Sequence, residues 1–227
     1  MRITGNKVEF FTESGKESSS VTKLTEQEIV RLIFENNYTK EIIVEELSGL
    51  AVNEIIYKLE VKQPLLNEQD QQTIGDIDAI IIPKKNPEKA IIVEFKRIKV
   101  NTLKDKSVIS NKISKARNKG FSQIKKLRRF NYFKTYLGVI IEDDARNVES
   151  ANTIIRRSQD DSVETIYEIN DDDKLEKNAG LFFITMTQPT GENINLRFNF
   201  GLNIEKNAVG MEQDNTITER VYKLTKE

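Results

Sequence analysis

Apolar positions recur at helical spacing near the start of the chain and at strand spacing after it. The run KVEFF at 7–11 predicts a short strand. Thr25 and Glu28 form the S/T-x-x-E pattern of a capping box, which predicts a helix to about residue 36. A second amphipathic segment ends near Gly49, so we expect two consecutive helices.

The next apolar runs have the character of strands. Residues 54–66 are β-like, and Pro64 places the end of this run at a sheet edge. Runs at 78–82 and 90–95 flank a loop rich in turn residues, which predicts a hairpin. A further apolar run at 136–141 suits a buried strand.

A long basic segment at 108–130 follows the hairpin and is predicted to be a helix with a break at Gly120. Beyond residue 141 we expect a helix at 145–158, a strand at 163–169 and a second hairpin at 180–200 with PTGEN as its turn. This order of elements predicts a mixed α/β fold, not an all-β barrel or a helical bundle.

Length and composition narrow the class of protein. The 227 residues are 37% hydrophobic and 31% charged, which suits one domain with elaborations. No apolar run approaches the roughly 20 residues of a membrane span, and the first residues lack the apolar stretch of a signal peptide. With no cysteine in the chain, we expect a cytoplasmic protein without membrane contact.

The chain also contains no histidine. Without histidine and cysteine there is no Ser-His-Asp triad, no cysteine protease site and no HExxH or thiolate zinc site. Acid–base and metal chemistry would therefore depend on Asp, Glu, Lys and Tyr. No GxxxxGK[ST] or GxGxxG pattern occurs, so nothing indicates a nucleotide-driven motor.

Charge is distributed unevenly along the sequence. Residues 84–136 contain seventeen Lys and Arg against three acidic residues, a net of +14. Residues 142–176 contain twelve acidic residues against four Lys and Arg, a net of −8. The basic region indicates an anionic partner, although two solvated faces that balance each other remain the alternative.

Charged side chains interrupt the two apolar strands of the first hairpin. Asp76 and Asp78 share one face of the first strand, and Glu94 and Lys96 share one face of the second. The opposite faces are wholly apolar. One antiparallel register that keeps the charged faces together places Asp78 opposite Glu94 and Asp76 opposite Lys96.

Two carboxylates directly across a ladder repel each other unless a cation lies between them. Carboxylate oxygens favour hard cations such as Mg²⁺ or Mn²⁺. The alternative is that this end of the hairpin emerges into solvent, with Glu94 and Lys96 as ordinary surface residues. Because D-x-D and E-x-K both lie within apolar strands, we favour a metal site.

The pattern GDIDAIII…AIIVEFKR resembles the PD-(D/E)xK nuclease superfamily. Its restriction-endonuclease-like core consists of a helix, a three-stranded meander, a helix and a further strand. The resemblance covers about residues 25–142, and Ile77 stands where the superfamily name has proline. It implies the same core here, with an extra C-terminal β hairpin.

The resemblance also implies roles for individual residues. Asp78 and Glu94 would be metal ligands, together with the backbone carbonyl of Phe95. Lys96 would be the catalytic lysine that lies near the attacking water. Asp76 remains an alternative ligand or a partner of Lys96.

Many members of the superfamily add a glutamate from the first helix. The candidates are Glu28, Glu35, Glu45 and Glu46, and we favour Glu35 because the capping box already accounts for Glu28. Some branches carry a Q-x-x-x-Y motif on the helix after the lysine strand. Gln123 matches its first position, but Leu127 replaces the tyrosine, so a solvated glutamine is the alternative to a site residue.

The basic segment would dock one apolar face on the sheet and leave its cations outside. These cations would supply phosphate contacts beside the site. The candidates, taken as a group, are Lys112, Lys115, Lys119, Lys125, Lys126, Arg128 and Arg129. An ordinary solvated basic helix is the alternative.

The resemblance implies Mg²⁺-dependent hydrolysis of nucleic acid, with Mn²⁺ as a substitute and DNA favoured over RNA. The expected role is that of a DNA endonuclease in restriction, defence or repair. A catalytically inactive nuclease-like fold that binds nucleic acid or serves in assembly is the alternative. A third reading is an interaction protein whose opposite charges drive self-assembly.

Three regions are expected along the chain. Residues 1–24 form an N-terminal strand and loop, residues 25–142 the nuclease-like core, and residues 143–227 an α/β extension packed on that core. Glu142 and the two aspartates after it are interpreted as a polar strand exit, not as a metal cluster. The C-terminal strands could cover the core, form the edge of a homodimer or bind another partner.

Overall fold

The computed structural model describes residues 2–10, 24–61, 76–100, 106–144, 175, 177–188 and 196–226. The strands are β1 (Arg2–Phe10), β2 (Ile55–Val61), β3 (Ile77–Pro83), β4 (Ile91–Val100), β5 (Lys134–Asp144), β6 (Ala179–Gln188) and β7 (Leu196–Lys206). The α-helices are α1 (Glu26–Glu35), α2 (Asn37–Ser48), α4 (Lys106–Leu127) and α7 (Asn215–Leu224). Short 3₁₀ turns are η2 (Val52–Glu54), η3 (Pro87–Lys89) and η4 (Arg128–Phe130).

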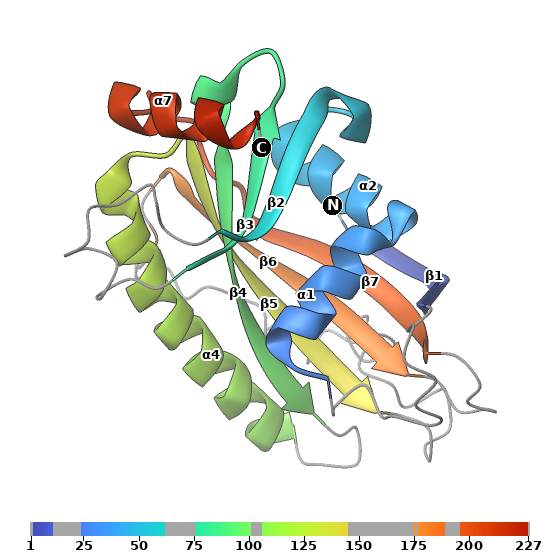
Figure 1. Ribbon diagram of the computed structural model, residues 1–227. Coiled ribbons are helices and arrows are strands. Elements are labelled where there is room, and N and C mark those ends of the chain that lie inside the picture. Colours follow the sequence, from blue (N-terminus) through green and yellow to red (C-terminus); the bar gives the residue numbers. More distant parts are fainter. Residues whose placement is uncertain are drawn as a thin grey trace.

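All seven strands belong to one mixed sheet, in the order β1-β7-β6-β5-β4-β3-β2. The strands β2, β3 and β4 form an antiparallel meander, and β4, β5 and β6 run parallel to one another. The strands β6, β7 and β1 continue as antiparallel neighbours. Figure 1 shows α1 and α2 on one side of the sheet and α4 along the other. The mixed α/β class predicted from the sequence is confirmed.

Helices α1 and α2 form where their caps predict. The Thr25 side chain accepts a hydrogen bond from the Glu28 backbone N–H, and the Glu28 carboxylate accepts one from the Thr25 N–H, which completes the capping box. Helix α2 ends at Gly49, whose φ of 72° is the left-handed conformation that glycine adopts without strain. Both helices cover a core that includes Ile33 and Phe34 of α1.

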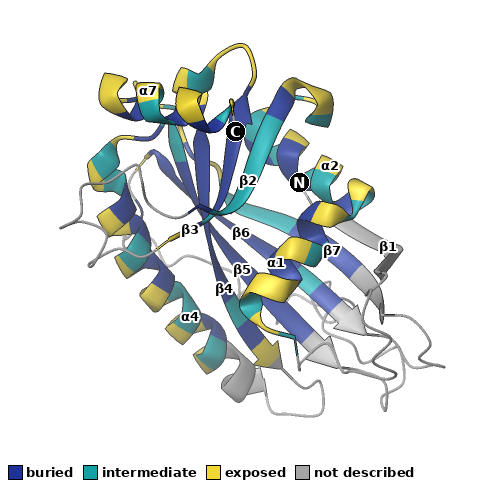
Figure 2. Cartoon of the chain, viewed as in Figure 1, coloured by how far each residue is buried: buried dark blue, intermediate teal, exposed yellow. Residues whose placement is uncertain are grey.

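The β3–β4 hairpin separates two cores by strict alternation. Ala79, Ile81 and Val93 face α1 and α2, whereas Ile80 and Ile92 face α7 and the end of α4. The ladder pairs Ala79 with Val93 and Ile80 with Ile92, which confirms the register expected from the sequence over this part of the hairpin. Figure 2 shows the central strands β3, β4 and β5 as mostly buried, whereas β2 is mostly of intermediate burial.

Helix α4 connects the parallel strands β4 and β5 and is continuous over 22 residues. The break predicted at Gly120 is therefore wrong. Gly120 is buried, and a Cβ atom at this position would lie 2.4 Å from Cδ1 of Leu137 on β5. The glycine is thus required by close contact between helix and sheet, and the helix continues through it because an internal glycine costs only about 1 kcal/mol.

The C-terminal strands extend the same sheet. The antiparallel pair β6–β7 confirms the second hairpin, and its turn lies outside the described residues, as do the helix predicted at 145–158 and the strand at 163–169. Helix α7 packs Ile217 and Val221 against the α4 side of the β3–β4 hairpin. None of the described helices is long and apolar enough to cross a membrane.

Candidate functional site

The site begins where β4 continues beyond its ladder pairing with β3. That pairing runs from Ile81 opposite Ile91 to Ala79 opposite Val93. One position farther along, the Asp78 carboxylate accepts a hydrogen bond from the Phe95 backbone N–H at 2.6 Å. A side chain therefore satisfies a backbone donor in the middle of a strand, which holds the carboxylate of Asp78 beside Glu94 and Lys96.

Lys96 lies on the same face of β4 as Glu94 and is buried, with a relative exposure of 8%. Its ammonium donates to Glu94 Oε1 at 2.7 Å and to the backbone carbonyl of Phe95 at 2.6 Å. One carboxylate oxygen and one carbonyl oxygen thus converge on a single positive charge. Both groups also belong to the metal-ligand set implied by the resemblance.

Burial strongly perturbs the two carboxylates. Burial, together with the neighbouring charge of Asp78, raises the pKa of Glu94 to about 7, against the lowering effect of Lys96. Burial likewise raises the pKa of Asp78 to about 6, opposed by the Phe95 N–H and by Lys96. The charges of Asp78, Glu94 and Lys96 therefore influence one another. A further cation beside them would favour ionisation of both acids.

Glu26, which the sequence interpretation missed, belongs to this neighbourhood. Its Oε2 atom accepts a hydrogen bond from the Arg97 backbone N–H at 2.7 Å, two residues beyond Phe95 on β4. Its charge also raises the pKa of both Asp78 and Glu94. The first turn of a helix favours a negative charge, but both Glu26 and Glu28 lie in this turn, so the sequence did not single out Glu26.

Glu60 is a second acidic neighbour that the sequence interpretation missed. The β2–β3 register pairs Leu59 with Ala79 and Val61 with Ile77, so Glu60 lies beside Asp78 on β2. Its backbone has φ of 51°, unusual for a residue other than glycine, and its carboxylate pairs with Arg31 of α1 at 3.2 Å. Its charge also raises the pKa of Asp78.

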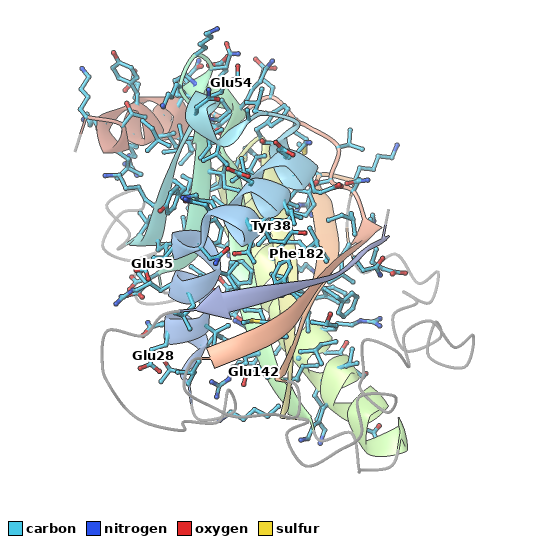
Figure 3. The ribbon with its side chains drawn as sticks, turned by 90° about the vertical axis from the view of Figure 1, so that its right-hand side faces the viewer. Glu28, Glu35, Tyr38, Glu54, Glu142 and Phe182 are labelled. Atoms are coloured by element: carbon cyan, nitrogen blue, oxygen red, sulfur yellow. The ribbon has the colours of Figure 1, made fainter. Side chains whose placement is uncertain are left out.

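Two other acidic candidates from the sequence, Glu35 and Asp76, are exposed. Glu35 is exposed at the last position of α1, nine residues from Glu26, which is roughly 13 Å along a helix. Figure 3 shows Glu35 farther along α1 than Glu28, which lies in the first turn. Asp76 is exposed just before β3.

Gln123 lies on α4 and is half-buried. Its Oε1 atom is buried and accepts no hydrogen bond from the residues that the structure describes. A fully solvated glutamine is therefore not what the structure shows at this position. A buried amide oxygen without a donor costs free energy.

Glu142 departs from the sequence interpretation. It is completely buried on β5 instead of forming part of a solvated strand exit, and Arg97 Nε lies 3.3 Å from its Oε1 atom. Burial raises its pKa to about 8, against the lowering effect of Arg97. Glu142 shares its side of the sheet with α1, and Figure 3 shows it near the level of Glu28 at the same end of the molecule.

The basic positions of α4 and of η4, which follows it, differ in exposure and in contacts. Lys115, Lys119, Lys125, Lys126 and Arg129 are exposed. Lys112 is half-buried and donates to the backbone carbonyl of Lys99 on β4, whereas Arg128 donates through Nε to Asn178 Oδ1, just before β6. The helix therefore presents cations on more than one flank.

Hard-cation chemistry fits the donors present. The described part of the chain has no group of three or more acidic residues with metal-binding geometry. The donor set here is two carboxylates, Asp78 and Glu94, with the Phe95 carbonyl oxygen. Two of these oxygens already converge on the Lys96 ammonium, and oxygen donors of this kind suit Mg²⁺ or Mn²⁺.

Comparison with known proteins gives no independent assignment. No protein-family model matches the chain, and neither curated proteins nor solved structures yield a match. The chemical interpretation therefore depends on the residues and contacts described above.

Proposed function

We propose that the protein is a metal-dependent nuclease that hydrolyses phosphodiester bonds in DNA, with a role in restriction, defence or repair. The observation that carries this proposal is the convergence of Glu94 Oε1 and the Phe95 carbonyl oxygen on the Lys96 ammonium. The Asp78 carboxylate is fixed one residue away on the Phe95 N–H.

The order of elements supports the same proposal. Helices α1 and α2 precede the antiparallel meander β2-β3-β4, and α4 then leads to β5, which pairs parallel with β4. This is the helix, three-stranded meander, helix and strand order that the resemblance to the PD-(D/E)xK superfamily implies. The strands β6, β7 and β1 are additions at the far edge of the sheet.

Phosphodiester hydrolysis needs a nucleophilic water and stabilisation of negative charge on the phosphate. A divalent ion held by Asp78, Glu94 and the Phe95 carbonyl would supply Lewis acidity and lower the pKa of bound water. The Lys96 ammonium would orient the attacking water and offset charge that develops on the phosphate. Burial of Lys96 and Glu94 strengthens these electrostatic effects.

Glu26 supports the site from α1. Its carboxylate fixes the β4 backbone at Arg97, directly after Lys96. This contact favours Glu26 over Glu35 as the glutamate that the first helix would contribute to the site. As a group that touches the strand and not the reacting atoms, it would act as a positioning residue.

The test is a cleavage assay on supercoiled plasmid, linear duplex, single-stranded DNA and RNA, with Mg²⁺, Mn²⁺ or EDTA. Wild type is compared with Lys96→Ala and with Lys99→Ala, an exposed lysine three residues farther along β4. We expect metal-dependent cleavage that Lys96→Ala reduces at least 100-fold, the size of a typical general acid–base contribution. Full activity of Lys96→Ala would refute the assignment.

A further inference from the structure

Three lysines of α4 recur at seven-residue intervals: Lys112, Lys119 and Lys126. Seven residues make almost two helical turns, so the three side chains leave the helix within about 40° of one another. Adjacent members lie roughly 10.5 Å apart along the axis at 1.5 Å per residue. They therefore form a straight line of positive charge, here called the lysine stripe.

The contacts of α4 fix the direction in which the lysine stripe faces. Lys112 donates to the Lys99 carbonyl, so this flank of the helix lies toward β4. Phe130 of η4, just beyond the helix, packs against the cluster that contains Ile80 of β3 and Ile92 of β4. The lysine stripe consequently borders the half of the sheet that contains Asp78 and Glu94.

The opposite flank faces β6 and β7. The charge of Glu205 on β7 interacts with that of Arg117, whose Cζ atom lies 5.9 Å from the centroid of the Phe121 ring. Arg128 bonds to Asn178, just before β6. Cations on this flank are directed away from the candidate site.

Along the direction of the strands, the lysine stripe also lies level with the site. Gly120 makes the close contact with Leu137 of β5, and Leu137 is the direct ladder neighbour of Glu94. Lys119 precedes this glycine and is exposed. It therefore projects at the level of Glu94, on the flank toward β3.

We propose that the lysine stripe is the surface that binds the nucleic-acid backbone and leads it to the site, with Lys119 as its central contact. The inference rests on the proposed function for the nature of the ligand. The interval of about 10.5 Å corresponds to roughly three nucleotides of a strand at 3.4 Å each. The seven cations predicted from the sequence as one group are therefore unequal.

Lys125 provides the discriminating comparison. It is an exposed lysine on the same helix, six residues from Lys119, which places it about 120° around the axis. Alanine is the best helix former, so Lys119→Ala and Lys125→Ala should both fold. Lys223→Ala on α7 removes an exposed lysine elsewhere and serves as the neutral control.

The experiment measures binding of a fluorescent 20-base-pair DNA duplex and of the matching single strand by anisotropy. It is run in EDTA, so that no cleavage occurs, between about 0.05 and 0.3 M salt. Loss of one phosphate contact lowers the slope of log K against log salt by about 0.9, which at 0.1 M is roughly an eightfold loss of duplex affinity. We expect this for Lys119→Ala, and about 60-fold for Lys119→Ala with Lys126→Ala.

The Lys125→Ala and Lys223→Ala proteins should lose less than about twofold. Equal losses for Lys119→Ala and Lys125→Ala, or the absence of any binding by wild type, would overturn the inference. Cleavage by wild type with Mg²⁺ is scored separately. Cleavage together with binding that does not depend on Lys119 would support the nuclease proposal and reject the lysine stripe. Binding that depends on Lys119 without cleavage would support the lysine stripe and reject the nuclease proposal.

Discussion

Replacement of Glu142 by glutamine should make the protein more stable at alkaline pH, although it removes one partner of an ion pair. Glu142 is fully buried, and burial raises its pKa from about 4.5 to about 8 despite the nearby Arg97. The folded protein therefore binds more protons than the unfolded chain between these two pH values. The titration of Glu142 consequently lowers the free energy of unfolding as the pH rises through this window. Below pH 4.5 this loss is absent.

The size of the effect follows from the shift of pKa. A shift of 3.5 units corresponds to about 5 kcal/mol at 1.36 kcal/mol per unit, which is large against a total stability of about 5–15 kcal/mol. Glutamine keeps the shape of the protonated acid but cannot ionise. At pH 5 the two proteins should differ little, and at pH 9 Glu142→Gln should be more stable by up to about 5 kcal/mol.

The assay is urea unfolding of both proteins at pH 5, 7 and 9, because the other acidic groups titrate in both and cancel in the difference. Glu88→Gln, at an exposed position in η3, serves as the control and should show no such trend. If Glu142→Gln is less stable than wild type at pH 9, attraction to Arg97 outweighs the penalty of burial. The reasoning would then be refuted.

Two further changes test the site and the core beneath it. Asp78→Asn should weaken binding of Mg²⁺ or Mn²⁺ in calorimetry and raise the melting temperature without metal, because it removes repulsion with Glu94; unchanged binding and melting would show that the carboxylates do not interact. Gly138→Ala should lower the free energy of unfolding by about 1–3 kcal/mol in urea, since its Cβ would lie 2.6 Å from the Phe95 ring. Unchanged stability would show that the ring can move aside at little cost.

Local sequence signals were sufficient for most of the secondary structure. The capping box at Thr25 and the glycine that ends α2 specify helix ends through hydrogen bonds and backbone conformation within a few residues. The alternation of β3 and β4 likewise specified their register, because a slip of one residue would turn every apolar side chain to the wrong face. The grouping of Asp78 with Glu94 and Lys96 followed from this register.

Other features depend on contacts between residues far apart in sequence. Glu26 reaches the Arg97 N–H across 71 positions, and no local pattern distinguished it from the other glutamates of the first helices. Gly120 looked like a helix break because only the approach of Leu137 shows why a side chain is excluded there. Glu142 looked like a solvated strand end because its complete burial is a property of the folded sheet, in which Arg97 of the neighbouring strand β4 lies beside it.

Sequence signals specified most helices and strands of the described residues and the register of the β3–β4 hairpin, and the residue types present excluded histidine and cysteine chemistry. These depend on local backbone preference, periodicity and residue type. The tertiary structure alone decided which carboxylates are buried, which glutamate joins the strand of Lys96, and which flank of α4 faces the candidate site. Burial and proximity arise only when helices pack on the sheet, and they set both the pKa values of the acids and the direction of the lysine stripe.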